Sequence, residues 1–121
     1  MSTGTFCLRT RVRVLHKGHD ACWYCGSPLS LDQMTVDHFC PKSKGGRGNI
    51  NNLVPACRLC NCSKGARELE EFRWTIRQKD SEWAAQGLFF SAAQRKYLES
   101  IGSYLPDPPW HRFWFEVKSY E

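Results

Sequence analysis

The spacing of hydrophobic positions predicts secondary structure in the N-terminal part of the chain. In residues 6–17, Leu8, Val12 and Leu15 recur at helical spacing. Val12 and Val14, which alternate with arginines, would instead suit a strand. We expect a helix here, followed by a tight turn in "GHDACWYCGSPL", where Gly26 supplies a turn residue.

Two short β-favouring runs follow, and a long polar segment separates them. The runs are "MTVDHF" (34–39) and "NLVPA" (52–56). The connecting segment "CPKSKGGRGNINN" (40–52) is rich in Gly, Lys and Asn, so we expect it to lack regular structure. Together these segments predict a hairpin with a long loop.

Helical periodicity returns after the second run. Residues 61–79 are expected to form one helix with Leu69, Phe72 and Ile76 on its apolar face. The predicted fold class is α+β, with a hairpin and its long loop followed by a helix and by additional C-terminal helices. We expect a single domain over residues 1–121 with its core at about 20–80.

A helical and aromatic extension is expected over about residues 81–121. Ser91 is expected to be the N-cap of a last helix that runs to about residue 103, with Ala93, Tyr97 and Ile101 on one face. "LPDPP" should end it. The following "WHRFWFE" is predicted to be extended, and its side chains Trp110, Trp114 and Phe115 are expected to pack against the core rather than stack on bases.

Composition is typical of a globular protein, with 41% hydrophobic residues among 121. No apolar run approaches the ~20 residues that span a bilayer, so no membrane association is expected. The N-terminus "MSTGTFCLRT" has no apolar signal-like region, and the expected compartment is the cytoplasm. A net charge of +5 permits a polyanionic partner such as nucleic acid.

Four of the seven cysteines form two C-x-x-C pairs, separated by 31 residues. In a reducing compartment such pairs predict a tetrahedral zinc site rather than disulfides. The ligands would be Cys22, Cys25, Cys57 and Cys60. No βαβ pattern surrounds either pair, which argues against a thioredoxin-like redox role. Cys7, Cys40 and Cys62 are expected to be buried or half-buried thiols.

Four segments, which include the two pairs, together resemble the HNH endonucleases: "CWYCG", "TVDHFCPKSKGG", "INNLVPAC" and "CRLCNCSKG". The resemblance covers about residues 20–66 and implies a ββα-metal core joined by a Cys₄ structural zinc. It also implies a metal-dependent DNA endonuclease, acting on DNA expected to be double-stranded. Cleavage would follow a one-metal mechanism and leave 5′-phosphate and 3′-hydroxyl ends.

The resemblance implies a catalytic role for each of four residues. His38 matches the first H and would be the general base, whereas Asn52 would brace the loop and so orient His38. Asp37 and Asn61 would hold the catalytic ion. Oxygen ligands of this kind suit Mg²⁺ or Mn²⁺. Asp37 and His38 would point to opposite faces because they are neighbours on a strand.

Basic residues beside this constellation are candidates for contact with DNA phosphates. Lys42, Lys44 and Arg47 lie in the loop, and Lys64 follows the second C-x-x-C pair. Two rival functions stay open. One is a non-catalytic zinc-binding module for nucleic acid, and the other is an interaction domain that uses the C-terminal aromatic segment. The sequence leaves the oligomeric state and the sequence specificity open.

Overall fold

The computed structural model describes residues 6–103 and 108–118, which divide into two compact units. The first unit contains the described residues up to Glu68 together with those from Arg112 onward. The second lies within Leu69–His111. The expected single domain over residues 1–121, with a core at about 20–80 and an extension, stays a prediction. Among the described residues no helix has the length and apolar character that crossing a membrane requires.

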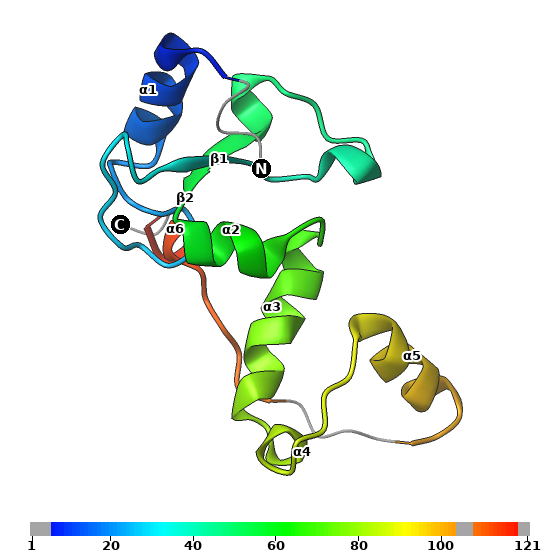
Figure 1. The fold of residues 1–121 in the computed structure, drawn as a ribbon. Helices are drawn as coiled ribbons and strands as arrows, with labels where there is room; N and C mark the ends of the chain where they lie inside the picture. Colours follow the sequence, from blue (N-terminus) through cyan, green and yellow to red (C-terminus); the bar gives the residue numbers. More distant parts are fainter. Residues whose placement is uncertain (1–5, 104–107, 119–121) are drawn as a thin grey trace. The chain divides into compact units, whose positions relative to one another are not determined.

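A two-stranded antiparallel hairpin forms the centre of the first unit, as the sequence predicts (Figure 1). Strand β1 (Thr35–His38) pairs with β2 (Leu53–Ala56), so that Asp37 lies opposite Val54 and His38 opposite Leu53. All eight strand residues are buried. The hairpin is therefore covered on both faces, and polar side chains on β1 need partners inside the protein.

Helix α1 (Leu8–Lys17) confirms the expected helix but not the expected apolar face. Its one fully buried residue is Val14, whereas Leu8 is 62% exposed. Lys17, in the last turn, donates to the carbonyl oxygens of Ile50 (3.0 Å) and Leu53 (2.8 Å). This lysine ties α1 to the point where the long loop returns into β2.

The long loop contains two 3₁₀ turns, contrary to the expectation that it lacks regular structure. They are η2 (Lys42–Lys44) and η3 (Ile50–Asn52). Between them, Gly46 lies so close to the backbone of Cys40 that a Cβ would come within 1.7 Å of the Cys40 carbonyl oxygen. Only glycine fits at this position, which folds the basic loop back on its own start.

The single helix expected over residues 61–79 is two helices in the structure. Helix α2 (Arg58–Lys64) ends at Gly65, and α3 (Leu69–Arg77) begins a new unit. Gly65 has φ 54° and ψ −132°, a conformation that side chains disfavour and that ends the helix. Cys57 caps α2, since its Sγ accepts a hydrogen bond from the Cys60 amide (3.4 Å).

The C-terminal aromatic segment is partly helical rather than extended, because Trp114–Lys118 forms α6. It packs on the first C-x-x-C segment, as expected for Trp114 and Phe115. Phe115 stacks on Trp23 with ring centres 5.3 Å apart. The amides of Trp114 and Phe115 donate to the carbonyls of Tyr24 and Trp23. These contacts hold the first C-x-x-C segment against α6.

The second unit consists of α3, η4 (Gln78–Asp80), α4 (Glu82–Ala85) and α5 (Ala92–Ser100). Its apolar centre includes Trp74 and Trp83, whose rings lie 6.2 Å apart. Trp110 does not enter a core as expected. Its ring is 60% exposed and lies 4.6 Å from the guanidinium carbon of Arg73.

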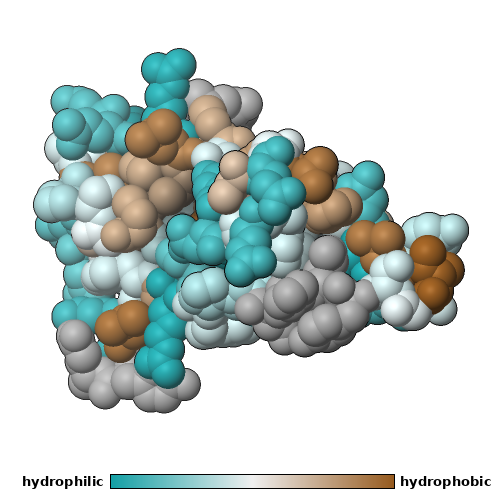
Figure 2. Space-filling model, turned by 90° about the horizontal axis from the view of Figure 1, so that it is seen from below, coloured by the Kyte–Doolittle hydropathy of each residue, from teal (hydrophilic) through white to brown (hydrophobic). Residues whose placement is uncertain are grey.

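Helix α5 begins with the predicted N-cap Ser91 but ends at Ser100, before the expected residue 103. Tyr97 (64%) and Ile101 (59%) are exposed, so the expected apolar face is not packed. Figure 2 shows exposed apolar residues scattered among hydrophilic ones on the face of the molecule in that view. The helix-breaking "LPDPP" falls largely outside the described residues.

Candidate active site and metal centre

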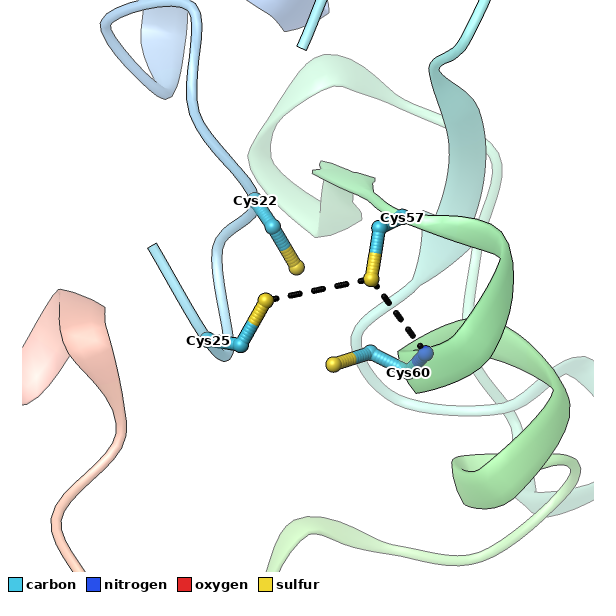
Figure 3. Close-up of side chains that lie close together, drawn as sticks. All are labelled: Cys22, Cys25, Cys57 and Cys60. Atoms are coloured by element: carbon cyan, nitrogen blue, oxygen red, sulfur yellow. Dashed lines mark hydrogen bonds between the residues drawn. The ribbon is translucent and has the colours of Figure 1, made fainter. Parts of the chain in front are cut away.

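The four predicted zinc ligands lie together at the base of the hairpin. Their sulfur atoms are all within 4.8 Å of one another (Figure 3). Cys22 and Cys25 come from the turn after α1, where Gly26 donates its amide to the Cys22 carbonyl (2.9 Å). Cys57 is the N-cap of α2, and Cys60 lies in the first turn of that helix. Two segments that are distant in sequence therefore converge on one cluster.

The dimensions of this cluster fit a tetrahedral metal site. Bonds of about 2.3 Å from zinc to sulfur place neighbouring sulfurs roughly 3.8 Å apart in a tetrahedron. The Sγ atoms of Cys25 and Cys57 are 3.8 Å apart. Burial and the neighbouring thiols raise the pKa of Cys57, so a cation is needed for all four sulfurs to be thiolates. The cluster can hold a zinc ion as a closed, structural site.

The other three cysteines lie outside the cluster. Cys40 is half-buried, as expected, but Cys7 and Cys62 are exposed. Burial was therefore the wrong expectation for these two, because the first turn of α1 and the outer face of α2 lie at the surface.

Asp37 is buried and bound from two directions. Its Oδ2 accepts a hydrogen bond from the Tyr24 hydroxyl (2.5 Å) and lies 3.2 Å from Nζ of Lys64. Burial raises the pKa of this carboxyl group, and both contacts oppose that rise by stabilising its anion. Sequence reasoning missed Tyr24, because an aromatic residue inside a C-x-x-C pair gives no signal beyond packing.

Lys64 does not lie where the expected phosphate contact requires it. Its side chain is completely buried, and Nζ also donates to the backbone carbonyl of His38 (3.1 Å). A fully buried ammonium group is stable only when it is paired, and Asp37 supplies the counter-charge. In this structure Lys64 thus orders the end of β1 and does not face solvent.

His38 lies at the end of β1 with an unsatisfied ring nitrogen. The residue is 8% exposed, and among the described residues its Nε2 has no hydrogen-bond partner. The Phe6 ring lies 5.9 Å away, and Gly48 of the loop is close enough that a Cβ there would lie 3.8 Å from Nε2. Burial and the charge of Lys42 lower the pKa of His38, which favours the neutral imidazole.

Asn52 has the contacts that its expected bracing role requires. Its side-chain oxygen accepts from the amide of Cys40 (2.8 Å), and its nitrogen donates to the carbonyls of Cys40 (3.0 Å) and Arg47 (2.8 Å). Its own carbonyl accepts from the amide of Phe39 (2.8 Å). One residue thereby links the two ends of the long loop immediately after His38.

Asn61 is half-buried on α2, one turn before Lys64. Residues three apart lie on the same helix face, and Lys64 contacts Asp37 from that face. From this spacing we expect Asn61 to share the face of α2 that contacts β1. The three loop residues expected to meet phosphates, Lys42, Lys44 and Arg47, are all exposed.

Comparisons with known proteins agree with this arrangement. Residues 22–67 match the family model described as HNH endonuclease. A curated protein described as CRISPR-associated endonuclease Cas9, from Corynebacterium diphtheriae, is 38% identical over 56 residues. That match covers 46% of this chain but only 5% of the Corynebacterium protein.

A solved structure has a similar fold. The Type II-C Cas9 enzyme from Actinomyces naeslundii matches with a TM-score of 0.51 and 28% identity, over 55% of this chain and 8% of that one. Residues 22–67 of this chain are therefore similar to the HNH endonucleases, which confirms the expected resemblance. The chain corresponds to a small part of the length of both relatives.

We expect Cys57→Ala to lose the bound zinc and the cooperative fold of the first unit. Structural zinc contributes on the order of 10 kcal/mol to folding, and three thiolates bind it much less strongly than four. Zinc content by mass spectrometry of metals and thermal unfolding by circular dichroism check this. Cys62→Ala is the matched control, because Cys62 lies on the same helix but outside the cluster. A folded, zinc-free Cys57→Ala protein would disprove the structural role.

We expect Asn52→Ala to loosen the long loop without loss of zinc. It removes the three side-chain hydrogen bonds at Cys40 and Arg47, so unfolding should become easier by about 1–3 kcal/mol. Hydrogen exchange of the loop amides should rise. Asn51→Ala is the control, since Asn51 is exposed and lies in the same 3₁₀ turn. Equal loop protection in the two variants would contradict the bracing role.

Proposed function

We propose that this chain is a metal-dependent DNA endonuclease that hydrolyses phosphodiester bonds. The observation that carries this proposal is the buried Nε2 of His38, which has no hydrogen-bond partner among the described residues. It lies beside an ordered carboxylate, within a segment that matches the HNH endonucleases. A ring nitrogen of this kind can accept a proton from a water molecule. A purely structural histidine would be expected to use both of its ring nitrogens.

In this proposal each residue has a separate task. His38 takes the proton of the attacking water, and Asn52 keeps the loop closed around the imidazole. Asp37 and Asn61 offer oxygen ligands to a divalent cation, Mg²⁺ or Mn²⁺, which when bound would stabilise the negative charge that develops on the phosphate. We propose that the products carry 5′-phosphate and 3′-hydroxyl ends.

The proposed DNA surface is the exposed basic loop. Lys42, Lys44 and Arg47 lie on the segment that Asn52 fixes next to His38, so phosphates bound there would lie near the general base. Double-stranded DNA is the proposed substrate. One such site cuts one strand, and a double-strand break would need two copies or two encounters.

The first test is cleavage of supercoiled plasmid in Mg²⁺ or Mn²⁺ by wild-type protein and by His38→Ala. Loss of a positioned base should lower the cleavage rate by about 10²–10⁴-fold. Zinc content and DNA binding should be unchanged. His16→Ala, at an exposed histidine of α1, should cleave like wild type. Absence of cleavage by the wild type in either metal would instead favour the non-catalytic zinc-binding module.

The rate of the wild type should increase with pH, because only neutral His38 accepts a proton. Since burial and Lys42 lower the pKa of His38, this increase should be centred below the ordinary value of about 6.5. Lys42→Ala removes one of the cations that lower the pKa, so it should move the increase to higher pH. Single-turnover rates across the acidic range measure both effects. A profile that does not move in Lys42→Ala would contradict this assignment.

Neutralising any one of Lys42, Lys44 or Arg47 should weaken DNA binding to a similar extent for all sequences. Each lost phosphate contact should reduce the slope of log K against log salt by about one unit. Lys96→Ala, an exposed lysine of α5, is the control. Fluorescence anisotropy at several salt concentrations measures the slopes. A change in sequence preference with an unchanged slope would indicate base recognition instead.

A further inference from the structure

Tyr24 connects the cysteine cluster to the proposed catalytic carboxylate. It lies between Cys22 and Cys25 and is only 2% exposed. The ring is fixed by Phe113, which meets it edge-on at 5.7 Å, and by Phe39, which stacks at 6.5 Å. The hydroxyl therefore reaches Asp37 Oδ2 from a side chain with little freedom to move.

Lys64 makes the equivalent connection from the second pair. It lies one helical turn after Cys60 on α2, and its Nζ is 3.2 Å from the same Oδ2. The contacts that the described residues make with this carboxylate thus both fall on Oδ2, and none falls on Oδ1. A carboxylate that is held at one oxygen by two groups on different segments cannot rotate freely.

We propose that Tyr24 and Lys64 are positioning residues that hold Oδ2 of Asp37 and leave Oδ1 as the ligand of the catalytic divalent cation. Tyr24 lies inside one C-x-x-C pair and Lys64 follows the other on α2, so a metal held by the cysteine cluster would help to set the orientation of Asp37. This inference rests on the proposed function, because it concerns the same catalytic site. Tyr24 and Lys64 would thereby connect the structural site formed by the four cysteines to the exchangeable cation site at Asp37.

A carboxylate binds a metal ion less tightly when it is free to rotate, because binding must then also fix its orientation. Groups that hydrogen-bond to a ligating carboxylate fix its direction, and their loss typically reduces metal affinity about 10–100-fold. Tyr24 is suited to this task because its neutral hydroxyl donates a hydrogen bond to the carboxylate and leaves the negative charge of the carboxylate in place. If Tyr24 and Lys64 served only to satisfy a buried carboxylate, they would affect stability and leave metal affinity unchanged.

The test is Tyr24→Phe in zinc-loaded protein, because phenylalanine keeps the ring contacts and removes only the hydroxyl. Mn²⁺ binding without DNA, followed by electron paramagnetic resonance, should show a Kd raised about 10–100-fold. Zinc content should stay at the wild-type value, and saturating Mn²⁺ should restore most of the cleavage rate. Tyr97→Phe is the matched control, since Tyr97 is exposed on α5.

An unchanged Mn²⁺ affinity in folded, zinc-loaded Tyr24→Phe would overturn the inference. If the wild type itself neither bound Mn²⁺ nor cleaved DNA, the proposed function would fail instead, so the two failures are distinguishable. A second measurement keeps the hydroxyl and avoids any risk to folding. With 3-fluorotyrosine at position 24, the ¹⁹F resonance should shift on titration with Mg²⁺, and a constant resonance would count against the proposal.

Discussion

The convergence of four cysteine sulfurs within 4.8 Å is the constraint on which the rest of the first unit depends. The hairpin has only two strands of four residues each, and such a hairpin is marginal alone. A cation held by four thiolates would fix the turn after α1 to the start of α2, and the hairpin lies between these two segments in sequence. The separation of the two pairs thus sets where β1 can lie.

The two neighbouring residues at the end of β1 have contrasting surroundings. Asp37 is surrounded by donors, from Tyr24 and Lys64, whereas Nε2 of His38 is buried without a partner among the described residues. Because strand neighbours point to opposite faces, one stretch of backbone can place a fixed anion on one side and a histidine ring on the other. Such asymmetry would be costly in a purely structural site, since a buried unsatisfied nitrogen destabilises the fold.

The loop after His38 has a composition typical of flexible segments, but hydrogen bonds hold its backbone in one conformation. Its glycines and lysines suggest a mobile segment, yet Asn52 at its end bonds to Cys40 at its start and to Arg47 within it. Lys17 also donates to the carbonyl of Ile50, where the loop returns to β2. The exposed basic side chains are therefore carried by an ordered backbone. That arrangement reduces the conformational entropy that binding to a phosphate backbone would otherwise cost.

The sequence alone determined the hairpin, the cysteine cluster and the candidate residues around His38, because each has a local signature in spacing or composition. It could not determine that Lys64 is buried, since a lysine after a C-x-x-C pair is equally compatible with solvent. Tyr24 was missed for the same reason, because the partner of its hydroxyl is 13 residues away on another element. The break at Gly65 and the division into two units also depend on backbone geometry and packing, which a periodic apolar pattern over residues 61–79 does not encode. Only the tertiary structure decided which buried charges are paired, because burial and pairing are properties of segments brought together from distant parts of the chain.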